Sequence, residues 1–226
     1  YNGLIAPVEG FAARGFVWYQ GESNLKTADR YAEQMERMVR FWRERWSDKQ
    51  ARMPFIYVQI APYENKNADD IDAALLMEAQ IDASERIANS HIVCTTDTGE
   101  KSCIHPSDKQ TVGRRIAAQA LRRSYGVKLP DDAVEGVRFE RAEFANGQAT
   151  VTFRNAKYGL TPQGEAIAGF ELAGADGIFH PAEGRIVKSR PQVTVTSPEV
   201  PEPVAVRYAF RNFIPTNLHN TLGQAV

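Results

Sequence analysis

The sequence has few of the features that mark several large protein classes. Only two of its 226 residues are cysteines, too few for a small scaffold held together by disulfide bonds. No apolar run approaches the roughly 18–20 residues that a membrane span requires. Neither sign of charge dominates, because 27 lysines and arginines balance 28 acidic residues and leave a formal net charge of -1. We therefore expect a globular chain whose partners include no nucleic acid and no membrane.

Patterns for metal ions and common cofactors are also missing. The four histidines are scattered singly, with no pair at ligand spacing on one predicted element; they are His91, His105, His180 and His219. The sequence contains neither a glycine-rich phosphate-binding loop nor a dinucleotide fingerprint. We therefore expect chemistry that needs no metal and no organic cofactor.

The two cysteines, Cys94 and Cys103, lie nine positions apart, without the paired spacing of a zinc site or of a redox pair. In an oxidising compartment they can close a short loop just before His105. Two unrelated buried thiols are nearly as well supported, and the spacing leaves both alternatives open.

Hydrophobic patterning predicts an α/β layer in the first part of the chain. Short apolar runs typical of buried strands alternate with longer stretches in which apolar residues recur every three or four positions. The strands are predicted at 15–19, 54–61 and 91–95, and the helices at 28–46, 73–89 and 109–125. This alternation indicates a parallel sheet with helices on its faces.

The character of the sequence changes near residues 126–133, where glycine and proline become frequent. Turns such as Asn146-Gly147 and Asp176-Gly177 separate some of the short strands that follow, as hairpins require. These strands are predicted at 134–140, 148–155, 169–173, 185–188, 192–196 and 204–210. We therefore predict an α/β domain over residues 1–128 and a small all-β module over residues 129–226.

Seven residues at the end of the first predicted strand combine groups that are useful in catalysis: Trp18-Tyr19-Gln20-Gly21-Glu22-Ser23-Asn24. The strand stops at a glycine, and a carboxylate, a hydroxyl and an amide follow it. Open α/β sheets place their ligand crevice at the carboxyl ends of their strands. This motif is therefore a candidate site. The structural alternative is an ordinary turn in which Ser23 and Asn24 cap a helix.

A second motif follows the third predicted strand and leads into the third helix: Ile104-His105-Pro106-Ser107-Asp108-Lys109-Gln110-Thr111-Val112-Gly113-Arg114-Arg115. A lone histidine is more often structural than catalytic, but Pro106 fixes the backbone beside His105. Both His105 and Glu22 lie in loops that follow strands of the same predicted sheet. We therefore expect them to face one crevice.

Both motifs resemble segments of one family, the sialate O-acetylesterase-like branch of the SGNH (GDSL-like) hydrolases. The first resembles that family's Trp-Tyr-Gln-Gly-Glu-Ser-Asn block, and the second its Ile-His-Pro…Lys-Gln…Gly-Arg-Arg segment. Further similarity at residues 1–7, 203–209 and 217–218 extends the resemblance over essentially the whole chain, but only to the latter part of the family's sequence. The resemblance implies an α/β fold with a flavodoxin-like parallel sheet and helices on both faces, followed by the small all-β module.

The resemblance also implies a function, a carbohydrate O-acetylesterase that removes acetyl groups from sugar hydroxyls by a Ser-His-acid acyl-enzyme mechanism. The partner would be an acetylated sugar or glycan, and the protein would be secreted or periplasmic. The family's nucleophile belongs to a Gly-Gln-Ser-Asn or Gly-Asp-Ser block, which this chain lacks. We therefore expect an N-terminal segment of the same protein to supply the serine. The alternatives are an acetylxylan esterase of the same superfamily and a carbohydrate-binding or structural fragment without turnover.

Ester cleavage by a serine requires a base and an acid that orients it. His105 is the candidate base, and Glu22 is the candidate acid. Many SGNH enzymes carry an aspartate two or three residues before the histidine, where this chain has Ser102 and Cys103. Since neither can supply the anion, Glu22 is favoured and Asp97 is held in reserve.

The same chemistry requires hydrogen-bond donors for the developing oxyanion. Gln20 and Asn24 carry amides that can donate, and the resemblance ranks Gln20 above Asn24. Ser23 is a poor candidate nucleophile, because a residue beside the acid is badly placed to meet a separate base.

Overall fold

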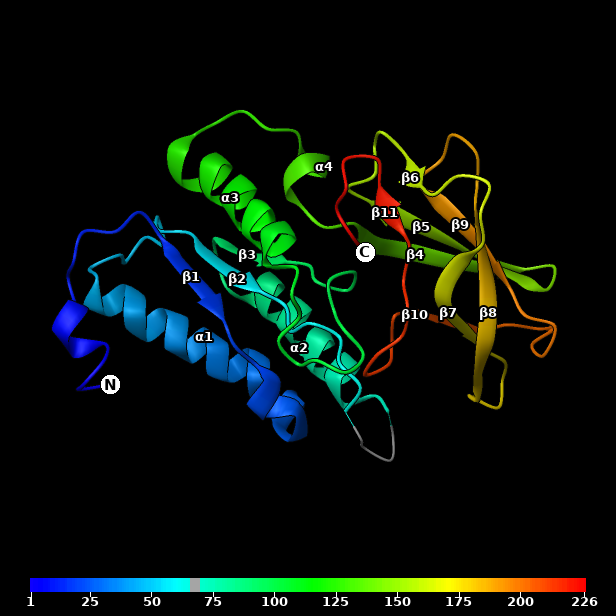
Figure 1. The fold of residues 1–226 in the computed structure, drawn as a ribbon, viewed down its shortest axis with the longest axis horizontal. Helices are drawn as coiled ribbons and strands as arrows, with labels where there is room; N and C mark the ends of the chain where they lie inside the picture. Colours follow the sequence, from blue (N-terminus) through cyan, green and yellow to red (C-terminus); the bar gives the residue numbers. More distant parts are fainter. Residues whose placement is uncertain (66–69) are drawn as a thin grey trace.

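The computed structural model describes residues 1–65 and 70–226, and its first part is a three-stranded parallel sheet in the order β1-β2-β3 (Figure 1). β1 spans Phe16–Tyr19, β2 spans Phe55–Val58 and β3 spans Ser90–Val93. The central strand β2 is buried along its whole length, as its uninterrupted apolar sequence predicts. A short 3-10 helix precedes β1 at Ala6–Val8, and another follows it at Glu22–Thr27.

Helices cover both faces of this sheet, as predicted. α1 (Ala28–Arg45) and α2 (Asp72–Arg86) lie side by side on one face, and α3 (Lys109–Tyr125) covers the other (Figure 1). Each of the two strand-to-strand crossovers carries its helix on the same face, as expected when both have the same hand. Among the described residues, no helix has both the length and the apolar character needed to cross a membrane.

β1 forms one edge of the parallel sheet, and its outer part is poorly covered. Val17 and Tyr19 are 58% and 38% exposed. Their register partners Ile56 and Val58 on β2 are buried against α3. In the described part of the chain, the free edge of β1 therefore presents apolar side chains and unpaired backbone groups.

The second part of the chain forms a six-stranded antiparallel sheet in the order β10-β7-β8-β9-β5-β4. Its strands are β4 (Arg138–Ala145), β5 (Gln148–Arg154), β7 (Ile167–Ala173), β8 (Phe179–Ile186), β9 (Gln192–Thr196) and β10 (Ala205–Tyr208). A small two-stranded sheet joins β6 (Leu160–Thr161) to β11 (His219–Asn220). One apolar core, which includes Val151, Phe153 and Leu172, holds this β-rich part together.

The predicted elements are largely confirmed, and α3 and β9 have the predicted bounds. The strand predicted at 134–140 is wrong at its start. Residues Asp131–Val134 form the short helix α4, and the strand begins only at Arg138. Pro130 favours extended backbone before this helical turn, and acidic residues are favourable in a first turn.

The strand predicted at 185–188 overlaps only the end of β8, which spans Phe179–Ile186. β8 begins at Phe179, just after the turn at Gly177, because it pairs with β7 along the hairpin that this turn creates. β6 and β11 have two residues each and were not predicted, since such short segments carry no periodicity.

The last residues of the chain leave the β module and return to the α/β layer. The buried side chain of Asn212 accepts a hydrogen bond from the backbone N–H of Ala73 at 2.8 Å. This bond caps the start of α2, where no neighbouring side chain does so. Thr216 Oγ1 donates to the carbonyl of Thr96 at 3.1 Å, and Thr96 Oγ1 donates to the carbonyl of Val226 at 2.7 Å. Since these contacts cross the boundary at residues 128–129, the division into two domains stays a prediction.

Candidate active site

The loop after β1 is held by its backbone and by one glycine. The carbonyl oxygen of Gln20 accepts hydrogen bonds from the Tyr31 hydroxyl at 3.0 Å and from Gln80 Nε2 at 3.3 Å. A Cβ atom on Gly21 would lie 2.6 Å from Ile60 Cγ2, closer than side chains approach one another. The loop can pass this close to β2 only because residue 21 is glycine.

The two side-chain amides of this loop are joined to each other. Gln20 Nε2 donates to Asn24 Oδ1 at 2.8 Å, and Asn24 Nδ2 lies 3.4 Å from Thr27 Oγ1. The structural alternative is not observed, because neither the 3-10 helix at 22–27 nor α1 has a side-chain cap at its N-terminus. Each amide nitrogen has a second hydrogen without an acceptor in the described residues, so both can donate to an oxyanion.

Glu22 is half-buried in the same loop and forms no hydrogen bond or ion pair with any described residue. Burial, and secondly the charge of Glu22, raises the pKa of the neighbouring Tyr19. The ring of Tyr19 lies 5.8 Å from Lys109 Nζ, at the start of α3. This contact brings the segment that follows His105 against the strand that precedes Glu22.

His105 lies in the loop between β3 and α3, and its neighbours brace that loop. Glu100 Oε1 accepts a hydrogen bond from the backbone N–H of Ser107 at 2.6 Å and another from its hydroxyl at 2.7 Å. These bonds hold the pKa of Glu100 below its ordinary value. Cys103 Sγ donates to the carbonyl of His105 at 3.2 Å. The imidazole is exposed and has no hydrogen-bond partner within the described ranges, so it is free to meet a reacting group.

The same loop packs tightly on the loop that follows β2. A Cβ atom on Gly99 would lie 2.3 Å from the carbonyl oxygen of Pro62, so only glycine fits there. The backbone N–H of Glu64 donates to the carbonyl of Lys101 at 3.1 Å. The strand-end loops therefore support one another.

Asp97, the reserve acid, is engaged by other partners. Arg115 Nη1 and Nη2 donate to its two carboxylate oxygens, each at 2.7 Å, and His219 Nε2 lies 3.0 Å from Oδ2. Burial raises the pKa of Asp97, but the hydrogen bonds from Arg115 and His219 outweigh it and hold the pKa well below its ordinary value. In the part of the chain that the structure describes, Asp97 forms no hydrogen bond with His105. Asp97 thus holds Arg115 and His219 in place, and we call this its anchoring role.

Arg115 and His219 are the site residues that sequence analysis missed. Their common partner Asp97 lies 18 residues from Arg115 and 122 residues from His219, so no local pattern links the three. The one signal in the sequence is the place of Arg115 in the Gly-Arg-Arg end of the second motif.

The remaining candidates are placed as follows. Both cysteines are free thiols, so the structure favours unrelated thiols over a disulfide-closed loop. Ser23 is exposed and has no hydrogen bond to His105. Among the described residues, no three or more His, Cys, Asp or Glu side chains are grouped to hold a metal ion.

Comparisons with known proteins give a family match for most of the α/β layer. Residues 2–122 match the family described as carbohydrate esterase, sialic acid-specific acetylesterase. The chain is 29% identical over 144 residues to a sialate O-acetylesterase of Mus musculus and 30% identical over 143 residues to one of Homo sapiens. Each alignment covers 57% of this chain but only 26% and 27% of the two relatives, so the match spans about a quarter of their length.

A solved structure is also similar along the whole chain. The crystal structure of a carbohydrate acetylesterase from Xanthomonas citri superposes with a TM-score of 0.88 at 35% identity, and the match covers 100% of this chain and 52% of that one. Both parts of the present fold thus have a counterpart in that protein.

The anchoring role of Asp97 makes a prediction about stability. We expect Asp97→Asn to lower the free energy of unfolding by about 3–5 kcal/mol at neutral pH, because it leaves the buried guanidinium of Arg115 without its anion. Urea denaturation followed by circular dichroism measures this loss. Asp29→Asn is the matched control, since Asp29 forms only a surface ion pair with Arg30 and should change stability by less than about 1 kcal/mol.

The pH dependence follows from the sign of the pKa shift. Because folding lowers the pKa of Asp97, the pair contributes its full stability above the unfolded pKa of about 3.9 and loses it as the pH falls. The free-energy gap between the wild type and Asp97→Asn should therefore narrow as the pH falls below about 5. A gap that stays constant down to acid pH would contradict the anchoring role.

Proposed function

The chain belongs to the carbohydrate esterase family of sialic acid-specific acetylesterases, and from this premise we propose that it supplies the base, the acid and the oxyanion donors of a carbohydrate O-acetylesterase. One observation carries the proposal: the side chains of Glu22 and His105 have no partners in the described residues. Both lie on braced loops at the carboxyl ends of the strands. Side chains that no other group of the protein holds are free to contact a substrate in a crevice at the ends of the strands. The substrate would be an acetylated sugar or glycan, and a secreted or periplasmic location is part of the proposal.

The proposed reaction proceeds through an acetyl-enzyme. A serine hydroxyl attacks the carbonyl carbon of the acetyl group and passes its proton to His105. Glu22 stabilises the imidazolium, and Gln20, with Asn24 as second donor, stabilises the oxyanion. Collapse of the tetrahedral intermediate breaks the bond to the sugar oxygen, which takes the proton from His105 and leaves as a hydroxyl. Water then gives a proton to His105 as it attacks the acetyl-serine, and acetate leaves as His105 returns that proton to the serine oxygen.

We assign the nucleophile to another segment of the same protein, which would add a parallel strand to the free edge of β1. Such a strand would complete a flavodoxin-like sheet, and its carboxyl end would lie beside Gln20 and Glu22. A helix that follows it would cover Val17 and Tyr19, and burying a side chain of this size contributes roughly 1.5–3 kcal/mol. The exposed apolar edge of β1 supports this assignment.

The base role predicts a kinetic effect. In the full-length protein, His105→Ala should lower kcat on 4-nitrophenyl acetate by about 10³-fold or more, because binding and the oxyanion hole alone remain. His180→Ala is the matched control, since His180 lies in the β module and pairs with Glu199. A folded His105→Ala protein that keeps a tenth of the activity would remove His105 from the base role.

The acid role predicts an order of defects. Glu22→Gln keeps the shape of the side chain but removes the anion, so kcat should fall by up to about 10⁴-fold. Asp97→Asn, assayed at a temperature where it is folded, should retain most of the activity. The reverse order would transfer the role of acid to Asp97.

The proposed nucleophile can be located by labelling. A fluorophosphonate probe should modify one serine of the full-length protein, and peptide mapping should place it outside the 226 residues described above. Labelling should slow in His105→Ala, because the base activates the serine. Modification of Ser23 or of any other serine within this chain would refute the assignment.

A further inference from the structure

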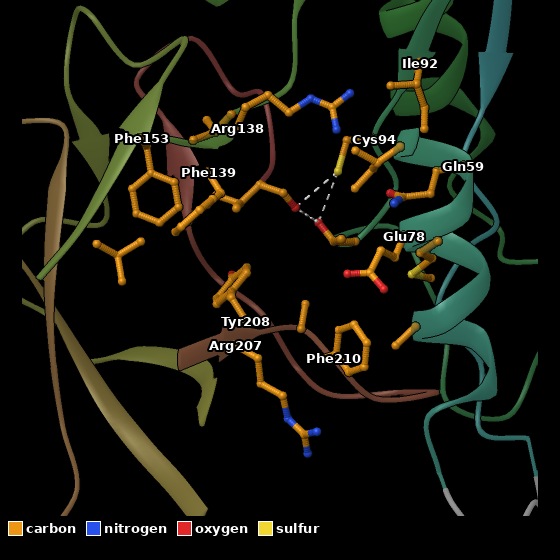
Figure 2. Close-up of a pocket in the computed structure, with 18 of the residues that line it drawn as sticks. Gln59, Glu78, Ile92, Cys94, Arg138, Phe139, Phe153, Arg207, Tyr208 and Phe210 are labelled. Atoms are coloured by element: carbon orange, nitrogen blue, oxygen red, sulfur yellow. Dashed lines mark hydrogen bonds between the residues drawn. The ribbon is translucent and has the colours of Figure 1, made fainter. Parts of the chain in front are cut away.

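A cavity of about 480 Å³ lies between α2 and the β module (Figure 2). One wall comes from α2 and the ends of β2 and β3, and the other from β4, β5, β7, β10 and the segment that follows β10. The volume falls in the range of small-molecule sites, about 300–1,000 Å³. Neither Glu22 nor His105 lines the cavity, so the ester chemistry does not account for it.

The amide of Gln59 indicates that the cavity holds a polar ligand. Gln59 is only 4% exposed, and its Oε1 lies 3.4 Å from the backbone nitrogen of Thr95. Its Nε2 has no acceptor in the described part of the chain, and Figure 2 shows the side chain directed into the cavity. The nitrogen is not among the described side-chain atoms that are both buried and unpaired, and it faces the cavity, so a ligand that accepts a hydrogen bond can reach it.

Charged side chains of both signs line the two walls, as suits a ligand that is itself neutral and polar. Three carboxylates on the α2 side face three guanidinium groups on the β side; they are Glu78, Asp82 and Glu85, and Arg138, Arg154 and Arg207. One ion pair joins the walls, Arg154 to Glu85 at 3.8 Å. Glu78, Asp82 and Arg138 have no ion pair among the described residues. Arg207 is bound instead to Glu171 at 2.7 Å, outside the lining. The cavity thus offers carboxylate acceptors and a guanidinium donor, the two kinds of partner that hydroxyl groups use.

Aromatic residues also line the same space, and two of them lie beside irregularities of the backbone. Arg138 and Phe139 both line the cavity, and the register of β4 against β5 shifts just after them. Tyr208 and Phe210 line the other end, and the residue between them, Ala209, has a φ of +55°. A positive φ at a residue other than glycine is uncommon and marks a constrained position. Phe139 is 58% exposed, so its ring is available to a ligand.

We propose that this cavity binds a neutral segment of an oligosaccharide. The apolar faces of sugar rings lie against Phe139 and Phe210, and sugar hydroxyls bond to Gln59, Glu78 and Arg138. The choice of a sugar over other neutral polar molecules rests on the proposed function. The cavity would then hold part of the glycan while ester cleavage takes place at the carboxyl ends of the strands of the parallel sheet.

Binding can be tested without any hydrolysis. Isothermal titration of the full-length protein uses four neutral tetrasaccharides without acetyl esters: cellotetraose, xylotetraose, mannotetraose and lacto-N-neotetraose. We expect at least one of them to bind at millimolar concentration or below. Phe139→Ala should raise its Kd by about fivefold or more, since an aromatic contact is worth on the order of 1 kcal/mol. Phe144→Ala on the same strand is the matched control, because Phe144 is exposed but lies outside the cavity.

Gln59→Leu is the second variant, and it removes the amide while keeping the volume. It should weaken binding by a similar factor, and Phe139→Ala carries the test alone if Gln59→Leu does not fold. Absence of binding by all four sugars would overturn the proposal, as would binding that neither variant changes. Since the probes carry no ester, loss of esterase function and loss of this site are separately visible.

Discussion

The buried guanidinium of Arg115 connects three parts of the chain that are distant in the sequence. It donates to the carbonyl of Cys94 at the end of β3, to both carboxylate oxygens of Asp97 and to the carbonyl of Gly223 near the C-terminus. At 4% exposure, its charge is stable only because this set of acceptors surrounds it. This one side chain therefore contributes both to the position of α3 relative to β3 and to the docking of the last residues.

The candidate active site follows from that arrangement. α3 begins four residues after His105, so fixing α3 against β3 also fixes both ends of the loop that carries the imidazole. Close passages at Gly21 and Gly99 hold the strand-end loops on the sheet, and a larger side chain would displace either loop. Asp97 has its hydrogen bonds within this framework, whereas Glu22 has none in the described residues. This difference supports our proposal that Glu22, and not Asp97, is the acid.

The β module is connected to the α/β layer by more than the chain itself. Asn212 caps the start of α2, Thr216 and Val226 bond to the segment after β3, and His219 completes the partners of Asp97. The cavity lies within the same interface and carries both the amide of Gln59 and charged side chains of both signs. A module held this firmly can contribute to the recognition of a glycan as well as to stability. The free edge of β1, at the opposite side of the sheet, remains the place for a further strand.

The sequence by itself determined the elements whose signals are local. α3 has its predicted bounds because Asp108 caps it through the backbone N–H of Thr111 and Gly126 ends it in a left-handed conformation. The strands of the parallel sheet were predictable because each is a short run of mostly apolar residues. Glu22 and His105 were also recognisable from local sequence, since each lies in a short motif that follows such a strand.

Only the tertiary structure decided which distant groups meet. The cap of α2 by Asn212 joins residues 139 positions apart, and the contact of His219 with Asp97 spans 122. The cavity likewise combines α2 with strands of another sheet. A local sequence pattern reflects only the periodicity of one segment. Which distant residues become partners depends on how the two parts of the chain pack together. For that reason the sequence indicated the candidate catalytic groups, and the fold alone revealed what holds them and what lies beside them.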